Sequence, residues 1–377
     1  MNKKLNIVQI VPFYYPSVGG VEFVAKYISE ELVKRGHFVK VFTANRNHKG
    51  LSKINVPSFE IINGVEVHRF KSQFNIGHMS ICPDMYKELR RNQVDLIHLH
   101  GYRHPHNEIA YLVNKHKSVP IVLHGHSPFI ESQFLSLKKK VLYGSYDFIN
   151  RKRLSSRINH FIALTEFEKN RYIKLGVEFG KISIIPNAAS DECFETIDPK
   201  PFIKKHSLSG KRIILFIGNL NRAKRPDILI KAIHKIKDTI PNIFLLIVGP
   251  DEGSYKELVN LAIDLNVQKY YKWLGPLYEN DKSEAFASAE VFILPSDMDA
   301  LPLVLVEAMA YGLPVISTNA IGPKTIIEDG KSGLLVKKGD VDGIAEATIK
   351  LLSNEGYYMK IAKYAKSERA SNISLSR

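Results

Sequence analysis

The sequence predicts an α/β protein of two doubly wound, Rossmann-like domains, each with a parallel sheet, that face each other across a cleft. Three observations lead to this prediction. The chain has 377 residues, more than one ordinary hydrophobic core accommodates. Short apolar segments alternate with longer amphipathic ones, and this alternation stops near residue 191 and restarts near residue 211. Because alternating strands and helices imply right-handed crossovers and parallel strands, two such blocks predict two domains.

The first block covers residues 1–190. It opens with the strand-like LNIVQIV and then the amphipathic VEFVAKYISEELVKRG, which ends at Gly36. Lysines before the apolar opening imitate a signal peptide, but Asn6 and Gln9 interrupt the run and Pro12 ends it, so a buried first strand is the better interpretation. Further strands are expected in FVKVFTA, VEVHRF, DLIHLH, PIVLHGH, HFIALT and KISIIPN.

The second block covers residues 211–355. A mixed segment with two X-Pro pairs, 191–210, precedes it as a linker, and a helical tail, 356–377, follows it. Strands are expected in RIILFIG, NIFLLIVG, KYYKWLG, VFILPS and PVISTN. Since ligands of doubly wound sheets bind beyond the carboxyl ends of the strands, the loops there and the cleft between the domains are the expected site.

One carboxylate stands out in the stretch DALPLVLVEAMAYGLPV, residues 299–315. Apart from Glu307, this stretch is almost wholly apolar from Leu301 onward, so the helix between Pro302 and Gly312 should be buried. A buried carboxylate without a partner is costly. We expect either that a ligand binds Glu307 or that a structural partner inside the protein does.

Two loops that follow strands suggest anion binding. In FIGNLNRAKRPD, Gly218 follows a strand, and Arg222 and Lys224 cluster before a helix, where they could hold a diphosphate. In PFYYPSVGGVEF, Gly19 and Gly20 lie between a strand and a helix, so backbone N–H groups could approach an anion. A solvated basic turn and a plain glycine turn are the respective alternatives.

Composition bounds the partners and the compartment. The two cysteines, Cys82 and Cys193, are far apart, show no metal-binding spacing and fit a reducing compartment. No segment approaches the ~20 apolar residues of a membrane span. The net charge of +15 is uneven, because residues 1–200 carry 29 Lys and Arg against 18 Asp and Glu. No nucleic-acid-binding motif accompanies this charge, so nucleic acid is the least expected partner.

The positive charge is densest in LKKKVLYGSYDFINRKRLSSR. There only Asp147 opposes seven basic residues, which are Lys138, Lys139, Lys140, Arg151, Lys152, Arg153 and Arg157. With Phe134, Tyr143, Tyr146 and Phe148 nearby, this segment predicts contact with an anionic membrane surface or an anionic acceptor; a solvated surface is the alternative.

Several motifs together resemble the retaining glycosyltransferases of family 4, which have the two-domain GT-B fold. The apolar stretch from Asp299 looks like the family's Glu-x7-Glu signature followed by EAMAxGxPV. GGVE, NRAKRPDILI, LIVG, LPS and GPKTIIEDGKSGLLV resemble further family motifs, so the resemblance covers nearly the whole chain. This combination is highly specific for the family and poorly specific for the substrate.

The resemblance implies roles for the matching residues. Glu307 is similar to the glutamate that binds the ribose diol of a nucleotide sugar, and Lys224 resembles the lysine that neutralises the diphosphate. Asp299, at the first signature position, would face the transferred sugar. Backbone N–H groups of Ala300 and Leu301 would reach the sugar or its phosphate.

On the acceptor side, His126 in VLHGHSPF resembles the family's histidine near the reacting centre. His124 is its close rival, and a purely structural histidine is the alternative.

The sequence also departs from the family. Asp299 is shorter than the usual glutamate, and Asn219 replaces an arginine, so Arg222 is an alternative contact for the diphosphate. The chain stops at RASNISLSR, near where the family usually adds a last helix that crosses back to the first domain. The DMD sequence ending at Asp299 imitates an Asp-x-Asp metal motif, but it is in register with the signature, so we expect no metal there.

The resemblance implies transfer of a sugar from a nucleoside-diphosphate donor to an acceptor hydroxyl, with retention and without a cofactor. The expected acceptor is lipid-linked or a glycan, and the expected location is cytoplasmic, peripheral at the inner face of the membrane. A sugar-nucleotide epimerase of the same fold and a non-catalytic nucleotide-sugar-binding protein are the alternatives.

Overall fold

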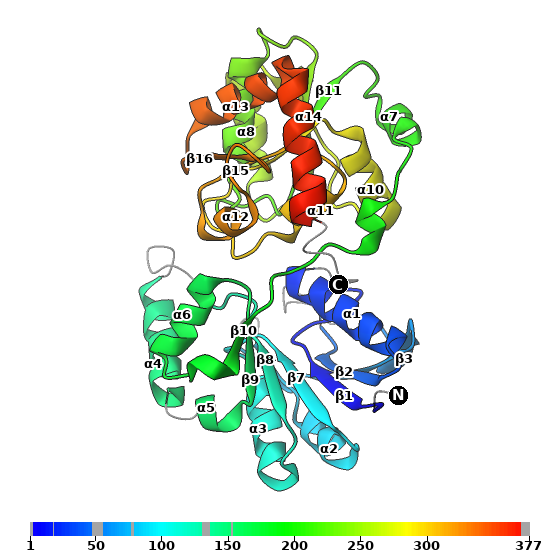
Figure 1. The fold of residues 1–377 in the computed structure, drawn as a ribbon, viewed down its shortest axis with the longest axis vertical. Helices are drawn as coiled ribbons and strands as arrows, with labels where there is room; N and C mark the ends of the chain where they lie inside the picture. Colours follow the sequence, from blue (N-terminus) through cyan, green and yellow to red (C-terminus); the bar gives the residue numbers. More distant parts are fainter. Residues whose placement is uncertain are drawn as a thin grey trace. The chain divides into compact units, whose positions relative to one another are not determined.

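The chain folds into two α/β units, residues 1–186 and residues 187–377, drawn in Figure 1. The computed structural model describes residues 3–17, 19–46, 56–76, 79–129, 136–151 and 154–370. The last seven residues of the chain, SNISLSR (371–377), and the basic residues Lys152 and Arg153 therefore lie outside the described residues, as does Phe134.

The N-terminal unit is built on an eight-stranded sheet with strand order β10-β9-β8-β7-β1-β2-β4-β3. All neighbouring strands are parallel except the β3–β4 pair. The strands are β1 (Asn6–Ile10), β2 (Phe38–Ala44), β3 (Phe59–Ile62), β4 (Val65–Phe70), β7 (Leu96–His100), β8 (Ile121–His124), β9 (His160–Ala163) and β10 (Ile182–Ile184). The short strands β5 (Phe74–Ile76) and β6 (Met79–Ile81) form a separate antiparallel pair.

Helices connect the parallel strands of this unit, as the crossover rule requires. They are α1 (Gly20–Lys34), α2 (Pro83–Arg91), α3 (Pro105–Lys117), α4 (Leu137–Asn150), α5 (Leu154–Arg157) and α6 (Glu166–Lys174). Helix α1 shows how local sequence sets these boundaries. Its apolar face buries Val24 and Ala25, and Gly36, with a φ of 89°, follows its end as predicted.

The C-terminal unit has a six-stranded sheet with strand order β13-β12-β11-β14-β15-β16, parallel throughout. Its strands are β11 (Arg212–Ile217), β12 (Ile243–Val248), β13 (Tyr271–Trp273), β14 (Val291–Leu294), β15 (Val315–Thr318) and β16 (Leu334–Val336). Its helices are α7 (Lys200–His206), α8 (Pro226–Ile236), α9 (Tyr255–Asp264), α10 (Glu279–Ser288), α11 (Leu303–Ala310), α12 (Ile321–Ile326), α13 (Val341–Ser353) and α14 (Glu355–Tyr364). Every residue of β12 is buried, as expected for a central strand covered on both faces.

Two segments, the expected linker and the expected tail, form helices that pack on the C-terminal unit. The expected linker, 191–210, contains a 3-10 turn at Asp191–Phe194 and helix α7, whose Phe202 is fully buried. In the expected tail, α14 packs near α13, and a π-helical turn, Ala365–Ala370, packs near α11 and α14. Buried apolar side chains hold both segments on the C-terminal unit.

In both sheets, the strand order reverses next to the first strand of the unit. The reversal lies between β1 and β7 in the N-terminal unit and between β11 and β14 in the C-terminal unit. Loops after these strands diverge and leave a crevice at the carboxyl edge, where doubly wound proteins bind ligands. The prediction of two doubly wound α/β units with parallel sheets is confirmed, and it identifies the chain segments in which a site should be sought.

Within the described residues, none of the helices combines the length and the apolar character needed to cross a bilayer.

Candidate active site

Donor-side residues predicted from the sequence meet at the switch point of the C-terminal sheet. Lys224 lies in the loop after β11, and Asp299 lies in the loop after β14. Lys224 Nζ donates a hydrogen bond to Asp299 Oδ1 at 2.5 Å, and both side chains are largely shielded from solvent. Asp299 Oδ2 is buried and accepts no hydrogen bond from a described residue. The pair therefore places a cation at the carboxyl edge and leaves one carboxylate oxygen for a ligand.

The two arginines of the β11 loop, Arg222 and Arg225, each form ion pairs with other acidic residues. Arg222 donates to Glu257 at 3.1 Å, and its side chain is 87% exposed, so it does not join the Lys224–Asp299 pair. Arg225 has a left-handed φ of 52° and donates to Asp227 and, at 3.0 Å, to Asp297. Both aspartates of DMD thus face a basic side chain in the structure.

A cavity of about 550 Å³ lies beside this loop. Its lining includes Asn221, Arg222, Arg225, Ser254, Glu257 and Asp297. Lys224 is not among the lining residues, so this cavity adjoins the Lys224–Asp299 pair without containing it.

Glycines follow β11 and β12 because the backbones of the two loops there pass very close to each other. Gly218 follows β11 and donates its N–H to Val248 O at 2.9 Å. A Cβ on Gly249, whose φ is 136°, would lie 2.0 Å from the Gly218 carbonyl oxygen. The two loops pass too closely for any side chain there. Asn219, in the position of the family arginine, donates to Glu252 at 3.0 Å.

The loop before α11 presents free backbone donors. Gly322 donates its N–H to Asp299 O at 3.0 Å, and a Cβ on Gly322 would lie 2.5 Å from both Asp299 O and Ala300 O. Helix α12 therefore clamps the loop through a contact that only glycine permits. The amide N–H groups of Ala300 and Leu301 have no acceptor among the described residues. They are available to a ligand at this edge of the sheet.

Glu307 is buried within α11, as predicted, and it has a structural partner. Its side chain is 4% exposed, and Lys282 Nζ from α10 donates to both carboxylate oxygens, at 2.7 and 2.8 Å. Pro302 is the N-cap residue, and Gly312, with a φ of 81°, follows the C-terminus of the helix. Because each carboxylate oxygen has further lone pairs, the bond to Lys282 leaves acceptor capacity for a diol.

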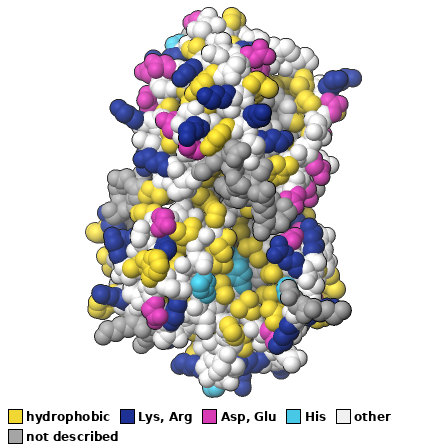
Figure 2. Space-filling model, in the orientation of Figure 1, with side chains coloured by type: hydrophobic (Ala, Val, Ile, Leu, Met, Phe, Trp, Pro, Cys, Tyr) yellow, Lys and Arg dark blue, Asp and Glu magenta, His cyan; other side chains and the backbone are white. Residues whose placement is uncertain are grey.

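The N-terminal unit places polar side chains on one face of its central strands. Gln9 on β1, His98 and His100 on β7, and His124 on β8 are all buried. His100 and His124 are register partners in neighbouring strands. On the face drawn in Figure 2, histidine atoms reach the surface of this unit among hydrophobic side chains.

His126, two residues beyond β8, is partly exposed and is the terminal member of a hydrogen-bonded chain. His126 Nε2 lies 2.8 Å from His100 Nδ1, and His100 Nε2 lies 2.6 Å from Gln9 Oε1. With Gln9 Oε1 as acceptor, His100 Nδ1 accepts from His126 Nε2, which leaves His126 Nδ1 as an acceptor for a ligand hydroxyl. Burial, followed by the charge of His98, lowers the pKa of His126 to about 3, so the ring is neutral at neutral pH.

His124, the rival of His126, is 3% exposed, and its ring stacks on His126 with centroids 3.8 Å apart. Neither of its ring nitrogens has a hydrogen-bond partner among the described residues. Of the two histidines, only His126 is positioned to meet a substrate from solvent.

At the start of α1, Gly19 lies against an internal carboxylate, whereas Gly20 does not. Gly19 is the N-cap residue, and a Cβ there would lie 2.3 Å from Glu22 Oε2. Glu22 is buried in the first helical turn, where a negative charge is favourable. Gly20 has open space around its Cβ position. In this structure, the carboxylate of Glu22 is the anion beside Gly19.

Sequence reasoning missed Lys282, His100 and Gln9. Lys282 lies 25 residues before Glu307, in a helix whose sequence does not mark it. The segment HLHGYRHPH holds four histidines in nine residues and could have drawn attention to His100. The link to Gln9 depends on strands far apart in the chain.

Comparison with known proteins agrees with the two-unit architecture. Residues 18–192 match the model described as Glycosyltransferase Family 4, and residues 199–368 match the one described as Glycosyl transferases group 1. Anabaena HepE, solved in complex with UDP and glucose, superposes with a TM-score of 0.79 at 17% identity, covering 99% of this chain and 96% of that one. The fold is GT-B, that of a class of glycosyltransferases.

Two relatives are similar over most of their length. N-acetyl-alpha-D-glucosaminyl L-malate synthase of Bacillus anthracis is 25% identical over 93% of this chain and 89% of its own. UDP-Gal:alpha-D-GlcNAc-diphosphoundecaprenol alpha-1,3-galactosyltransferase of Escherichia coli is 28% identical over 74% of this chain and 72% of its own. This chain belongs to the glycosyltransferases of family 4 and is a glycosyltransferase.

Proposed function

We propose that this glycosyltransferase moves a sugar from a nucleoside-diphosphate donor to an acceptor hydroxyl, with retention of anomeric configuration and without a divalent metal in the transfer step. The diphosphate binds at the switch point of the C-terminal unit. Glu307 binds the ribose diol, and His126 meets the acceptor side of the reacting sugar.

The observation that carries this proposal is the arrangement around Lys224. One shielded ammonium lies at the carboxyl edge, next to a loop with free amide N–H groups at Ala300 and Leu301. As the glycosidic bond breaks, negative charge grows on the departing diphosphate. A fixed cation and preorganised N–H donors stabilise that charge more than they stabilise the bound donor, which lowers the barrier.

Metal independence is supported by the pairing of both aspartates in DMD. Asp297 accepts from Arg225, and Asp299 accepts from Lys224, so each carboxylate already faces a cation of the protein. Lys224 then supplies the positive charge that a divalent ion supplies in other sugar-transfer sites.

Retention is supported by membership of the family and by a mechanism that needs no enzymic nucleophile. The acceptor hydroxyl attacks the anomeric carbon from the face that the diphosphate leaves. The C–O bond to the diphosphate breaks, the new C–O bond forms, and the hydroxyl proton passes to a diphosphate oxygen. His126, neutral at neutral pH, orients the reacting groups through its free ring nitrogen.

The test combines donor binding with product analysis. A thermal-shift panel of nucleoside diphosphates and their sugars identifies the donor, since a ligand that binds only the native state raises its apparent stability. With that donor, NMR of the product should show that the transferred sugar keeps the anomeric configuration it has in the donor, together with release of free nucleoside diphosphate. An epimerised sugar nucleotide without transfer, or tight binding without turnover on any acceptor, contradicts the proposed reaction.

We further propose that helix α4 holds the enzyme on the inner face of a membrane, where it meets a lipid-linked acceptor. Three consecutive lysines, Lys138 to Lys140, are exposed on this helix. Exposed apolar residues accompany them, with exposed fractions of 78% for Leu137, 62% for Val141, 56% for Leu142, 79% for Phe148 and 60% for Ile149.

The charge on α4 has little internal compensation. Its acidic residue, Asp147, accepts two hydrogen bonds from Arg103, at 2.9 and 2.7 Å, and is therefore already neutralised. Apolar side chains beside exposed lysines are typical of helices that lie in a membrane interface. The E. coli relative, by its name, acts on a diphosphoundecaprenol acceptor, which is lipid-linked.

Sedimentation with vesicles tests this contact. Binding should need anionic lipid and decrease with salt, because each basic residue near the surface contributes about 1 kcal/mol and is screened. Changing Lys138, Lys139 and Lys140 to Ser should weaken binding by roughly tenfold or more. A matched control changes the exposed Lys256, Lys360 and Lys363 of the C-terminal unit to Ser. Failure to bind anionic vesicles at low salt, or an equal loss in the control, refutes the role of α4.

A further inference from the structure

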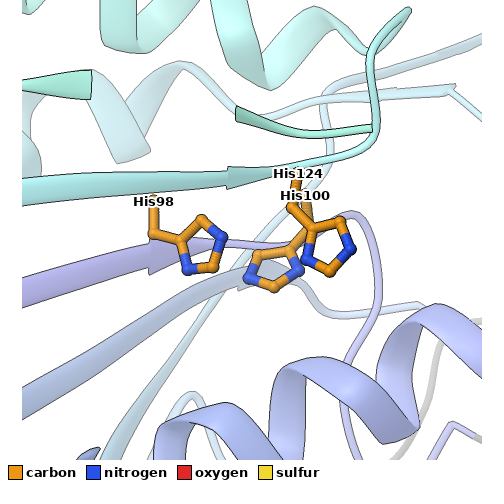
Figure 3. A group of neighbouring side chains, drawn as sticks. All are labelled: His98, His100 and His124. Carbon is orange, nitrogen blue, oxygen red and sulfur yellow. The ribbon is translucent and has the colours of Figure 1, made fainter. Parts of the chain in front are cut away.

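We propose that His98, His100 and His124 form a zinc-binding site inside the N-terminal unit. The three side chains come from adjacent strands, β7 and β8, and each offers one ring nitrogen within 4.8 Å of the others. Figure 3 shows the three rings gathered side by side at the strand ends. All three side chains are more than nine-tenths buried.

Hydrogen bonding does not account for this cluster. Both nitrogens of His124 and Nε2 of His98 are buried without a partner among the described residues. A neutral imidazole has one N–H donor and one acceptor nitrogen, and leaving these unpaired in the interior costs free energy at each atom. A second buried ring beside the first adds to this cost, because imidazoles cannot satisfy one another when stacked. His98 and His124 lie nearly parallel, with centroids 6.1 Å apart.

The chemical state of the rings suits metal binding. A metal ion binds the unprotonated nitrogen of a neutral imidazole. His124 makes no hydrogen bond to a described residue through either ring nitrogen, and Nε2 of His98 is likewise unpartnered. Each of these two rings can therefore present a lone pair to a metal ion without breaking a hydrogen bond.

His100 already has the orienting contact that ligating histidines use. Its Nε2 lies 2.6 Å from Gln9 Oε1. In metal sites, a ligating imidazole donates one N–H to an oxygen and coordinates through the other nitrogen. Coordination through Nδ1 would replace the 2.8 Å contact between this nitrogen and His126 Nε2.

Imidazole nitrogen favours zinc, copper, nickel and cobalt over magnesium and calcium, and zinc accepts three or four such ligands in a tetrahedral arrangement. Zn–N bonds of about 2.0–2.1 Å place two ligating nitrogens about 3.3 Å apart. The ring nitrogens lie within 4.8 Å of one another, so zinc binding requires the rings to move closer, to this spacing. Zinc would then tie β7 to β8 directly beneath His126.

Metal content tests the site without reference to activity. The full chain, purified with a tag that contains no histidine, is equilibrated with Zn²⁺, freed of excess metal by gel filtration and analysed by atomic emission. We expect about one zinc per chain, a higher unfolding midpoint with Zn²⁺, and tetrahedral visible absorption when Co²⁺ replaces zinc.

Two ring-preserving variants, His98→Phe and His124→Phe, should lose the bound metal and the Zn²⁺-dependent rise in midpoint. His116→Phe, which changes an exposed histidine on α3, should keep both. Circular dichroism without metal identifies variants that fail to fold, and His98→Gln and His124→Gln then replace them. Wild-type protein that retains well under one zinc per chain overturns the proposal, as do folded His98 and His124 variants that bind metal like wild type. Neither result bears on sugar transfer, which the donor and product assays decide separately.

Discussion

The bidentate contact between Lys282 and Glu307 allows the role of Glu307 to be tested against a purely structural one. Glu307→Ala removes a carboxylate that is 4% exposed and breaks both of its hydrogen bonds to Lys282, whose side chain is 23% exposed. Because Lys282 is close enough to solvent to find water, we expect a loss of about 1–3 kcal/mol in the free energy of unfolding, with the fold retained.

The same substitution should also weaken donor binding. This loss of affinity has a separate cause, the missing hydrogen bonds to the ribose, and cannot be estimated from the loss of stability. A carboxylate that accepts hydrogen bonds from a ribose diol contributes about 1.5–3 kcal/mol for each charge-assisted bond. Losing one such bond raises the donor Kd by roughly 10- to 150-fold. Glu307→Gln, which keeps the shape and one acceptor oxygen, should lose less than Glu307→Ala.

Isothermal titration calorimetry measures the Kd of the best nucleoside diphosphate and of its 2′-deoxy counterpart for each variant. Removing the protein carboxylate and the ligand 2′-hydroxyl separately and together then gives the coupling between them, as in a double-mutant cycle. Wild type should bind the deoxy compound more weakly, whereas Glu307→Ala should bind both compounds alike, because the interacting carboxylate is absent. Lys282→Met is the control, since it breaks the same internal pair and should still distinguish the two compounds. Equal discrimination by wild type and a folded Glu307→Ala would remove Glu307 from the ribose site.

Three further predictions concern Lys224, the DMD segment and Glu168, a buried residue of helix α6. Lys224→Ala should lower turnover by roughly tenfold to a few hundredfold, and more than Glu307→Gln does, because Lys224 faces charge that develops in the transition state; turnover equal to wild type in a steady-state assay would exclude that role. Transfer should persist in excess chelator, and complete loss that Mg²⁺ or Mn²⁺ restores would make DMD a metal site. Burial raises the pKa of Glu168 to about 7, so the native state binds a proton that the unfolded chain releases near pH 4.5, and stability from this group is lost as pH rises from about 4.5 to 7. Relative to wild type, Glu168→Gln should therefore gain up to about 3 kcal/mol across that window in urea unfolding, and parallel pH profiles would contradict the shift.

The alternation of apolar and amphipathic segments was sufficient to predict the fold class. Strand and helix periods are local, and parallel strands joined by helices allow few topologies, so the segments around β1, β11 and β12 could be predicted from sequence alone. The position of the ligand site within the fold then followed from the topology, because the loops at the carboxyl ends of the strands form a crevice where the strand order reverses. The proximity of Lys224 and Asp299, 75 residues apart in the chain, is consistent with that expectation.

Contacts between distant segments could not be predicted in the same way. Glu307 was expected to need a partner, but only the packing of α10 against the sheet identifies Lys282 as that partner. The segment 191–210 lacks strong periodicity, yet Phe202 is buried, because burial of a short helix depends on the surface available to it.

The sequence by itself determined the strand–helix order, the buried helix that carries Glu307 and the family to which the chain belongs, because each depends on residues close together in the chain. Only the tertiary structure decided which side chains meet. The strand order β8-β7-β1 brings His98, His100, His124 and Gln9 onto one sheet face, although 91 residues separate Gln9 from His100. The reason is that side-chain chemistry at a site depends on distances of a few ångströms, which chain folding sets between residues that no local pattern connects.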